Sequence, residues 1–140
     1  MFVKQLSVFI ENREGRLEQV TEVLASEGIN ILSLSMADTT EYGLLRMIVS
    51  NPQKAKKALT DEGFSAMLTD VIAVKLEDRV GALHKMTHIL CSLNLNIEYM
   101  YALASSGKRA MIVKASDGNA AVKALTEGGL ELFSNEEMCS

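Results

Sequence analysis

The sequence of 140 residues predicts an α+β fold in which one unit of about 70 residues occurs twice. The first observation is a repeated loop, which reads Glu-Asn-Arg-Glu-Gly-Arg-Leu from Glu11 and Glu-Asp-Arg-Val-Gly-Ala-Leu from Glu77, 66 positions later. The second is that the same offset returns near the end of each copy, where Lys-Ala-Leu-Thr stands at 57–60 and 123–126. The third is that strand and helix patterns alternate in the same order in both copies. Two copies are too few for a solenoid.

In the first copy, alternating apolar residues predict a strand over 3–11. Gly15 then opens a helical pattern, and Gly28 ends it. A second helix begins at Asn51 as the cap and Pro52 at the first helical position. The remaining expected elements of this copy are strands at 29–37, 44–50 and 65–69, a turn over 39–43, and a helix end near Gly63.

The second copy repeats this order, with Asp117 at the cap position of its second helix. Its expected elements are strands at 71–77, 95–103, 109–115 and 130–133, a turn at 105–107, an apolar helix stripe at Leu83, Met86 and Leu90, and a helix end at 128–129. One irregularity is the match of Met47-Ile48-Val49 with Met111-Ile112-Val113, at an offset of 64. It predicts a local slip of two residues and a shorter turn in the second copy.

The order strand, helix, strand, strand, helix, strand is that of ferredoxin-like folds, with two helices on one face of an antiparallel sheet. We therefore expect two such domains, 1–69 and 70–140, each with a thin core. The helix-free faces carry Phe9, Ile48 and Ile112. We expect these apolar faces to pack the units together and to support a homodimer or higher oligomer. The alternative is that they are scattered exposed apolar residues.

Composition excludes several classes of function. Apolar residues make up 48% and charged residues 23%, which is typical of a globular protein. The net charge of −4, with dispersed basic residues, argues against nucleic-acid binding. No apolar run is long enough to span a bilayer, and the start does not read as a signal peptide. We expect a cytoplasmic protein without nucleic-acid or membrane partners.

Catalytic and metal-binding motifs are weak. Phosphate-binding glycine loops are absent, and two histidines leave little for a Ser-His-Asp triad, so we expect neither an enzyme nor a cofactor. His84, His88 and Cys91 fall at helical spacing and could bind zinc or nickel, although Lys85 stands where zinc hydrolases have Glu. An exposed stripe is the favoured interpretation of the histidines. We expect Cys91 to be a small buried residue and Cys139 to lie on a mobile tail.

The two loops resemble those of the ACT domain family. The resemblance rests on Asn12–Leu17 with Gly28–Ile31, and on Asp78–Leu83 with Leu95–Ile97, and it covers nearly the whole chain as two ACT units. It implies a small effector, most often an amino acid, bound at an interface between units. It also implies a regulatory role rather than chemistry.

The same resemblance implies that Asn12 and Asn30 contact the effector, with Asp78 and Asn96 as their counterparts. The residue types suit this, because a helix N-terminus after Gly15 favours a carboxylate and an amide oxygen accepts from an ammonium. The charge of Asp78 would make the two sites inequivalent. Alternatively, these side chains are only caps or turn formers. The complete set of candidate ligand-binding residues is Asn12, Arg13, Glu14, Gly15, Arg16, Leu17, Asn30, Ile31, Asp78, Val80, Gly81, Ala82, Leu83, Asn96 and Ile97.

One further asymmetry separates the copies. Tyr99 and Tyr101 stand where the first copy has Ser33 and Ser35. Core or interface packing is one interpretation, and an asymmetric ligand pocket is the other.

The sequence thus predicts a tandem ACT protein that binds a free amino acid at the interface of its two units. Its regulatory effect on amino-acid metabolism would pass through an oligomer or a partner, such as an enzyme or a regulator. The alternatives are a ligand-independent oligomerisation module and, ranked lower, a metal-binding regulator that uses the helix histidines.

Overall fold

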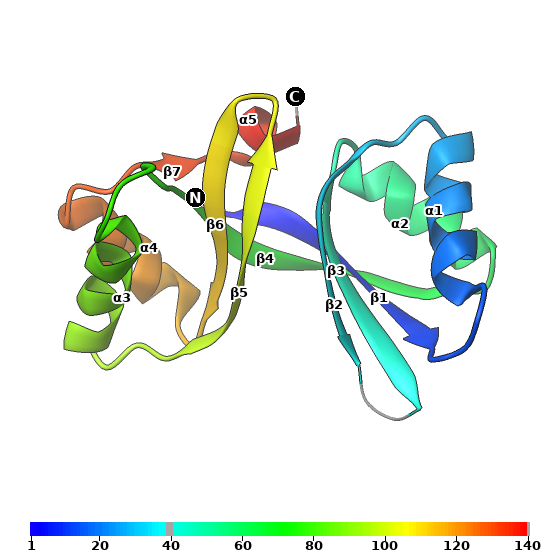
Figure 1. Ribbon diagram of the computed structural model, residues 1–140, viewed down its shortest axis with the longest axis horizontal. Helices are drawn as coiled ribbons and strands as arrows, with labels where there is room; N and C mark the ends of the chain where they lie inside the picture. The colour runs from blue at the N-terminus through cyan, green and yellow to red at the C-terminus, as the bar shows by residue number, and fades with distance from the viewer. Residues whose placement is uncertain (39–40, 140) are drawn as a thin grey trace. The chain divides into compact units, whose positions relative to one another are not determined.

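The computed structural model describes residues 1–38 and 41–139 (Figure 1). Its contacts divide the chain into two compact units. The first unit is Lys4–Thr69 together with Cys139, and the second unit is Asp70–Met138 together with Met1–Val3. Residues 39 and 40 of the first expected turn lie outside the described residues.

The first unit has the predicted order of elements. They are β1 (Val3–Glu11), α1 (Arg16–Ser26), β2 (Ile31–Asp38), β3 (Tyr42–Val49), α2 (Pro52–Asp61) and the beginning of β4 (Ser65–Lys75). The strand order is β2-β3-β1-β4, and β3 is antiparallel to both β1 and β2. Helices α1 and α2 cover one face of this sheet (Figure 1). The core between sheet and helices is made of Leu6, Val8, Ile10, Val20, Leu24, Ile29, Leu45, Met47, Val49, Ala55, Leu59 and Phe64.

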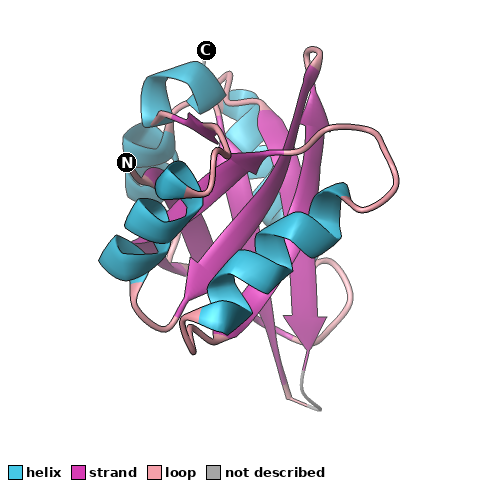
Figure 2. Ribbon diagram, turned by 90° about the vertical axis from the view of Figure 1, so that its left-hand side faces the viewer, coloured by secondary structure: helices cyan, strands magenta, loops and turns pink. Residues whose placement is uncertain are grey.

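The second unit repeats the arrangement. Its elements are the end of β4, α3 (Ala82–Ser92), β5 (Ile97–Ser105), β6 (Lys108–Ala115), α4 (Gly118–Glu127), β7 (Leu132–Phe133) and α5 (Asn135–Cys139). The strand order is β7-β4-β6-β5. Figure 2, seen from the side of this unit, shows helices in front of the strands. Its core contains Ile72, Val74, Met86, Leu90, Met111, Val113, Ala115, Ala121 and Leu125, with Phe2 packed against it. The ferredoxin-like fold class is therefore confirmed.

Two expected strands, 65–69 and 71–77, are a single strand in the structure. β4 runs without interruption from Ser65 to Lys75. The physical reason is that this segment contains neither glycine nor proline, so nothing in its sequence ends the extended backbone. Within the expected strand 71–77, residues 72–75 pair with β6, from Ile72 opposite Val113 to Lys75 opposite Ala110.

The predicted slip of two residues is wrong. Leu6 pairs with Met47 in the first unit, and Ile72 pairs with Val113 in the second. Val113, rather than Met111, is therefore the counterpart of Met47, and the offset of 66 holds through both hairpins. The two identical Met-Ile-Val sequences do not occupy equivalent positions, because pairing with the neighbouring strands sets the register.

The second hairpin closes with the tight turn that its sequence suggested. Ser105 pairs with Lys108, which leaves Ser106 and Gly107 as the two turn residues. Both have positive φ angles, 52° and 77°, as type I′ hairpin turns require. Equivalent pairs flank both hairpins, since Asp38 pairs with Gly43 and Ala104 pairs with Arg109. The offset of 66 therefore also holds at these pairs.

The helix-free faces are unequally exposed. Ile48 and Ile112 have no exposed surface, whereas Phe9 is 47% exposed. None of the described helices has the length and hydropathy that crossing a membrane requires.

The short helix α5 was not predicted from the sequence. Its start is a reciprocal capping box, in which the Ser134 amide donates to Glu137 Oε1 at 3.1 Å and the Glu137 amide donates to Ser134 Oγ at 3.2 Å. These hydrogen bonds lower the pKa of the Glu137 carboxyl group. The helix includes Cys139, and the mobility expected of this residue stays a prediction.

The caps of α2 and α4 are predicted to contribute equally to stability. Asn51 Oδ1 accepts from the Lys54 amide at 3.2 Å, and Asp117 Oδ1 accepts from the Ala120 amide at 3.1 Å. Replacing either cap with alanine should lower the free energy of unfolding by about 1 kcal/mol, because a helix-end amide loses its acceptor. Urea unfolding measures the loss. Serine at either position keeps an acceptor and should retain most of the stability, and an equal loss with serine would contradict this account.

Candidate functional site

Both candidate loops turn into their helices through a left-handed glycine. Gly15 has a φ of 84° and Gly81 a φ of 88°, and each is the N-cap residue of the helix that follows. A residue with a Cβ would be strained at either position. Neither glycine supplies a side-chain cap, so the positive end of each helix dipole is left for an anion or a partner.

Each loop carries an ion pair that the duplication has preserved. Arg13 Nε lies 3.1 Å from Glu11 Oε2, and Arg79 Nε lies 2.5 Å from Glu77 Oε2. All four side chains are more than half exposed, so these pairs orient the loops and add little stability.

The two loops differ at Asn12 and Asp78. The Asn12 amide donates to the Glu41 carbonyl oxygen at 3.0 Å. Asp78 Oδ2 instead lies 3.1 Å from Arg109 Nη1. The first unit has Gly43 at the position equivalent to Arg109, so it cannot form this ion pair. The carboxylate of Asp78 is therefore partly neutralised, which separates the chemistry of the two loops.

Asn30 and Asn96 are fixed by their backbones. The Asn30 amide donates to Ser50 Oγ at 2.9 Å, and the Ser50 amide donates to the Asn30 carbonyl oxygen at 2.9 Å. Asn96 and Ser116 repeat this exchange at 3.1 and 2.9 Å. Both asparagine side chains are exposed, and within the described residues their amide groups make no hydrogen bond.

The alternative helix-ending role of Asn30 finds no support in these contacts. Helix α1 ends through its own backbone, where the Gly28 amide donates to Ala25 and the Ile29 amide donates to Leu24. Gly28 has a φ of 70°, which is the usual conformation after a helix end. The Asn30 side chain takes no part in this cap.

The structure separates the candidate residues into two groups at opposite ends of each unit. Asn12 lies beside Glu41, just before β3, and Asn30 lies beside Ser50, just after it. The eight residues of β3 span about 25 Å. A free amino acid is far shorter, so it cannot contact both asparagines of one unit. Asp78 and Asn96 are separated in the same way by β6.

The loop group contains an unusual exposed apolar side chain. Val80 is fully exposed, and Leu17 and Leu83 are 38% and 36% exposed. Single exposed apolar residues are normal on protein surfaces. A fully exposed valine beside a glycine-capped helix is nevertheless suited to a contact with a ligand or partner.

Arg16 lies against its own unit. Its guanidinium carbon is 4.7 Å from the centroid of the Phe64 ring, and Nη1 donates to Gln19 Oε1 at 2.7 Å. This is a cation–π contact. Arg16 Nε is buried and has no hydrogen-bond partner among the described residues. The candidate ligand residue Arg16 is thus engaged internally.

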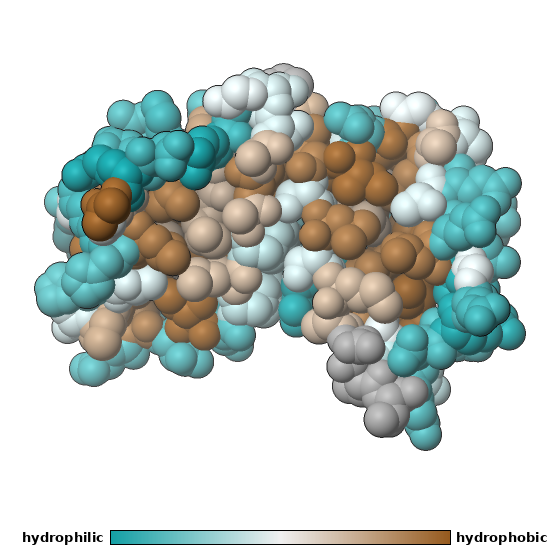
Figure 3. Space-filling view, viewed as in Figure 1, coloured by the Kyte–Doolittle hydropathy of each residue, from teal (hydrophilic) through white to brown (hydrophobic). Residues whose placement is uncertain are grey.

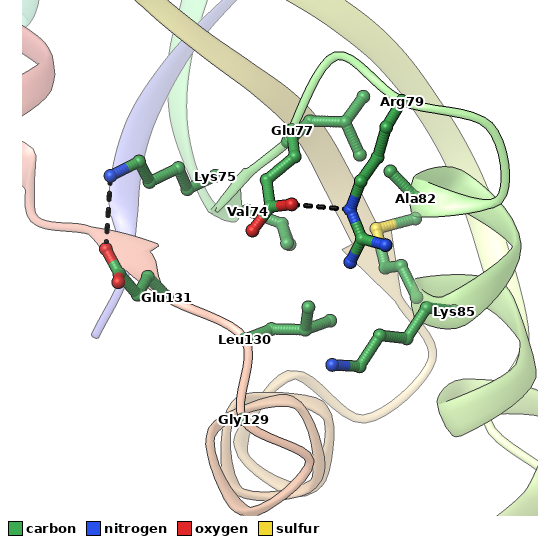
Figure 4. Close-up of a pocket in the computed structure, with 11 residues that line it drawn as sticks. Val74, Lys75, Glu77, Arg79, Ala82, Lys85, Gly129, Leu130 and Glu131 are labelled. Atoms are coloured by element: carbon green, nitrogen blue, oxygen red, sulfur yellow. Dashed lines mark hydrogen bonds and ion pairs between the residues drawn. The ribbon is translucent and has the colours of Figure 1, made fainter.

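Sequence reasoning missed a cavity of about 110 Å³ in the second unit (Figure 4). It lies between the end of β4 with the loop that follows, the first turns of α3, and the segment after α4. The lining residues are Val74, Lys75, Leu76, Glu77, Arg79, Ala82, Lys85, Met86, Gly129, Leu130 and Glu131. One signal in the sequence was Ala82, which stands where the first copy has Arg16.

The histidine stripe lies on an exposed face of α3. The ring centroids of His84 and His88 are 5.9 Å apart, and Cys91 is exposed. The expectation of a buried Cys91 is wrong, because Met86 and Leu90 form the buried face and Cys91 lies one position beyond it. In the part of the chain that the structure describes, no group of three or more His, Cys, Asp or Glu residues could hold a metal ion.

The tyrosines of β5 are half-buried. Tyr99 lies opposite Lys114 and Tyr101 opposite Ile112 on β6, whereas Ser33 lies opposite Ile48 in the first unit.

Comparison with known proteins identifies the family. The chain matches the ACT domain pair over residues 1–140. It belongs to the ACT domain pair family. A crystal structure of protein BT0572 from Bacteroides thetaiotaomicron is similar to this ACT pair with a TM-score of 0.94 and 38% identity, over 100% of this chain and 97% of that one.

Two further solved structures share the fold of the ACT pair. Both are regulatory subunits of aspartate kinase, and both are 23% identical to this chain. The subunit from Thermus thermophilus, in its ligand-free form, has a TM-score of 0.59 over 89% of this chain and 91% of that one. The subunit from Thermus flavus has a TM-score of 0.56 over 90% and 92%. No curated protein is significantly similar in sequence.

Proposed function

We propose that this ACT pair is a regulatory protein that binds a free amino acid at a site to which two ACT units contribute. The observation that carries the proposal is the pair of exposed amides of Asn30 and Asn96, whose backbones are fixed and whose side chains have no hydrogen bond within the described residues. An amide group offers both a donor and an acceptor to a zwitterion. Membership of a family of regulatory domains, and the fold shared with regulatory subunits of aspartate kinase, support the same role.

The geometry favours a site in which two units contribute different binding groups. A loop such as Asn12–Leu17, with its uncapped helix end, suits the carboxylate of the ligand. A strand start such as Asn30–Ile31 offers an amide oxygen to the ammonium group. Because about 25 Å separates these two groups within one unit, each ligand would take the loop of one unit and the strand start of another. The Asp78–Arg109 ion pair would make the second loop a different binding surface from the first.

The regulatory effect would follow from linkage. A ligand that binds one packing of the units, or one oligomeric state, stabilises that state by mass action. The proposed signal then reaches a separate enzyme or regulator, and the ACT pair itself performs no catalysis. We expect the protein to act as a homodimer or higher oligomer.

Thermal melting in the presence of each of the twenty free amino acids tests this proposal. A ligand at one hundred times its dissociation constant should stabilise the protein by about 2.7 kcal/mol. The gain should shrink in Asn30→Ala, which keeps the backbone bonds to Ser50 and so should fold normally. Asn119→Ala is the matched control, because Asn119 is an exposed asparagine on α4.

The possible outcomes test amino-acid binding and the assignment of its residues separately. If no amino acid at millimolar concentration raises the melting temperature, amino-acid binding is wrong. If one does and Asn12→Ala and Asn30→Ala both bind it as well as Asn119→Ala, the function stands and the residue assignment fails.

A second candidate function is a ligand-independent oligomerisation module. Leu34 and Met36 of the edge strand β2 are 39% and 42% exposed. Figure 3 shows a hydrophobic area over this strand and the strands beside it. Sedimentation over a range of protein concentrations tests this candidate, which requires association that no amino acid changes.

A further inference from the structure

The cavity of the second unit is large enough for a small ligand. Its volume of about 110 Å³ compares with the roughly 150 Å³ of an engineered apolar cavity that binds benzene. Val74, Met86 and Leu130 form its apolar part, and Val74 and Met86 are themselves buried core residues. The cavity is therefore open to solvent on the side of its charged residues and reaches the packed interior at Val74 and Met86.

The first unit shows how this space is filled when the chain supplies its own side chain. The equivalents of Ala82 and Leu130 are Arg16 and Phe64, 66 positions earlier. In the first unit the Arg16 guanidinium covers the Phe64 ring at 4.7 Å. In the second unit alanine and leucine stand at these positions, and the space between the helix start and the segment Gly129–Glu131 stays open. The first unit also has a hollow, of about 390 Å³, beside Arg16, Gln19 and Phe64, so the two units differ in the residues that line this place.

The charges around the cavity favour an anion. Lys75 Nζ lies 3.3 Å from Glu131 Oε2, and Glu77 pairs with Arg79 through Nε. Each of these two ion pairs has no net charge. The remaining lining cation is Lys85, whose ammonium has no ion pair or hydrogen bond within the described residues.

The donors converge on one space. Figure 4 shows the Arg79 guanidinium and the Lys85 ammonium extending toward the same region, with Leu130 facing them. The Arg79 Nη groups make no hydrogen bond in the part of the chain that the structure describes. A guanidinium fork and an ammonium group are the donors that bind carboxylates most strongly. The first unit has neutral Gln19 where the second has Lys85, and Gln19 is already bonded to Arg16.

We propose that this cavity binds a small carboxylate with a short apolar body. The carboxylate would be held by Lys85 and the Arg79 fork, and the apolar body would lie against Met86 and Leu130. The inference goes beyond the proposed function, because residues of the second unit alone line the cavity and Ala82 is the one candidate ligand residue among them. The carboxylate could come from a simple organic acid or from an amino acid, and the experiment separates these sources.

Titration of the ¹⁵N-labelled full chain with sodium propionate, at constant ionic strength, tests the proposal by NMR. We expect saturable shifts of the backbone amides of 82–86 and 129–131. Lys85→Gln and Leu130→Phe each copy the residue of the first unit, and each should weaken binding about ten-fold or more, through loss of a charge-assisted bond or loss of space. Lys123→Gln on the exposed surface of α4 changes the net charge equally and should leave binding unchanged.

Two further ligands sharpen the result. Propylammonium chloride has a similar body with the opposite charge and should not bind. Alanine adds an ammonium group beside Glu77, so tighter binding than propionate identifies amino acids as the source, and weaker binding identifies simple acids. Shifts that never saturate, equal shifts with propylammonium, or binding that survives both Lys85→Gln and Leu130→Phe would overturn the proposal.

The proposed function is tested separately. Propionate binding at 82–86 should persist in Asn30→Ala, whatever that variant does to amino-acid binding.

Discussion

Replacing Leu24 or Leu90 with alanine is expected to lower the free energy of unfolding by about 3 kcal/mol in each case. The two leucines are equivalent residues of α1 and α3, and neither has any exposed surface. Each substitution removes apolar contacts and leaves a cavity that the surrounding helix and sheet cannot fully close. A unit of about 70 residues has only a few kcal/mol of stability, so this loss is a large share of the total. Urea unfolding followed by circular dichroism measures it.

Leu93→Ala is the control for this pair. Leu93 directly follows α3 and is 58% exposed, so its truncation should cost less than about 0.5 kcal/mol. Similar losses at Leu24, Leu90 and Leu93 would mean that the helices do not bury the faces described above.

Phe2→Ala is expected to destabilise the second unit by about 3 kcal/mol, although Phe2 is at the other end of the chain. Met1–Val3 belong to the second unit by their contacts, and the Phe2 ring packs against its core. The expected loss is at the lower end of the range for a phenylalanine in a core, because the ring is only half-buried. Hydrogen exchange should show the loss in α4 and β6 before it shows in α1 and β3.

A double-mutant cycle with Gly118 tests the same contact. A Cβ built on Gly118 would lie 3.0 Å from Phe2 Cε1 and 3.1 Å from Cζ, so Gly118→Ala should crowd the ring. In the Phe2→Ala background that crowding is gone, and the added Cβ should cost little. Additive losses would show that the ring does not pack on the start of α4.

Local sequence signals predicted most of the fold, because they act within a few residues. The alternation in 3–11 gave the bounds of β1, and Asn51 and Asp117 occupy the cap positions expected of them. The pairing between strands was harder to predict, because similarity between short sequences does not determine the register. The Met-Ile-Val runs illustrate this, since only the neighbouring strands show that Met47 corresponds to Val113.

The candidate site was predictable in its parts and not in its arrangement. The glycine-capped loops were evident from the repeated motif. The separation of Asn12 from Asn30 was not, because α1 carries the chain from one end of the sheet to the other between them. Lys85 and Leu130 both line the cavity although they are 45 positions apart in the sequence. A local sequence pattern cannot predict that two such distant residues lie close together.

Because β4 is continuous, the two repeats are difficult to separate by proteolysis or by dividing the gene. Its first half completes one sheet, and its second half pairs with β6 and β7. Proteases cut best in exposed, unpaired segments, and the chain offers them no such linker between Ser65 and Lys75. Cutting the gene at this point would leave half a strand on each product, would part Phe2 from its core, and would create open sheet edges prone to aggregation. The two repeats are therefore better studied by exchanging equivalent residues than by expressing them as separate halves.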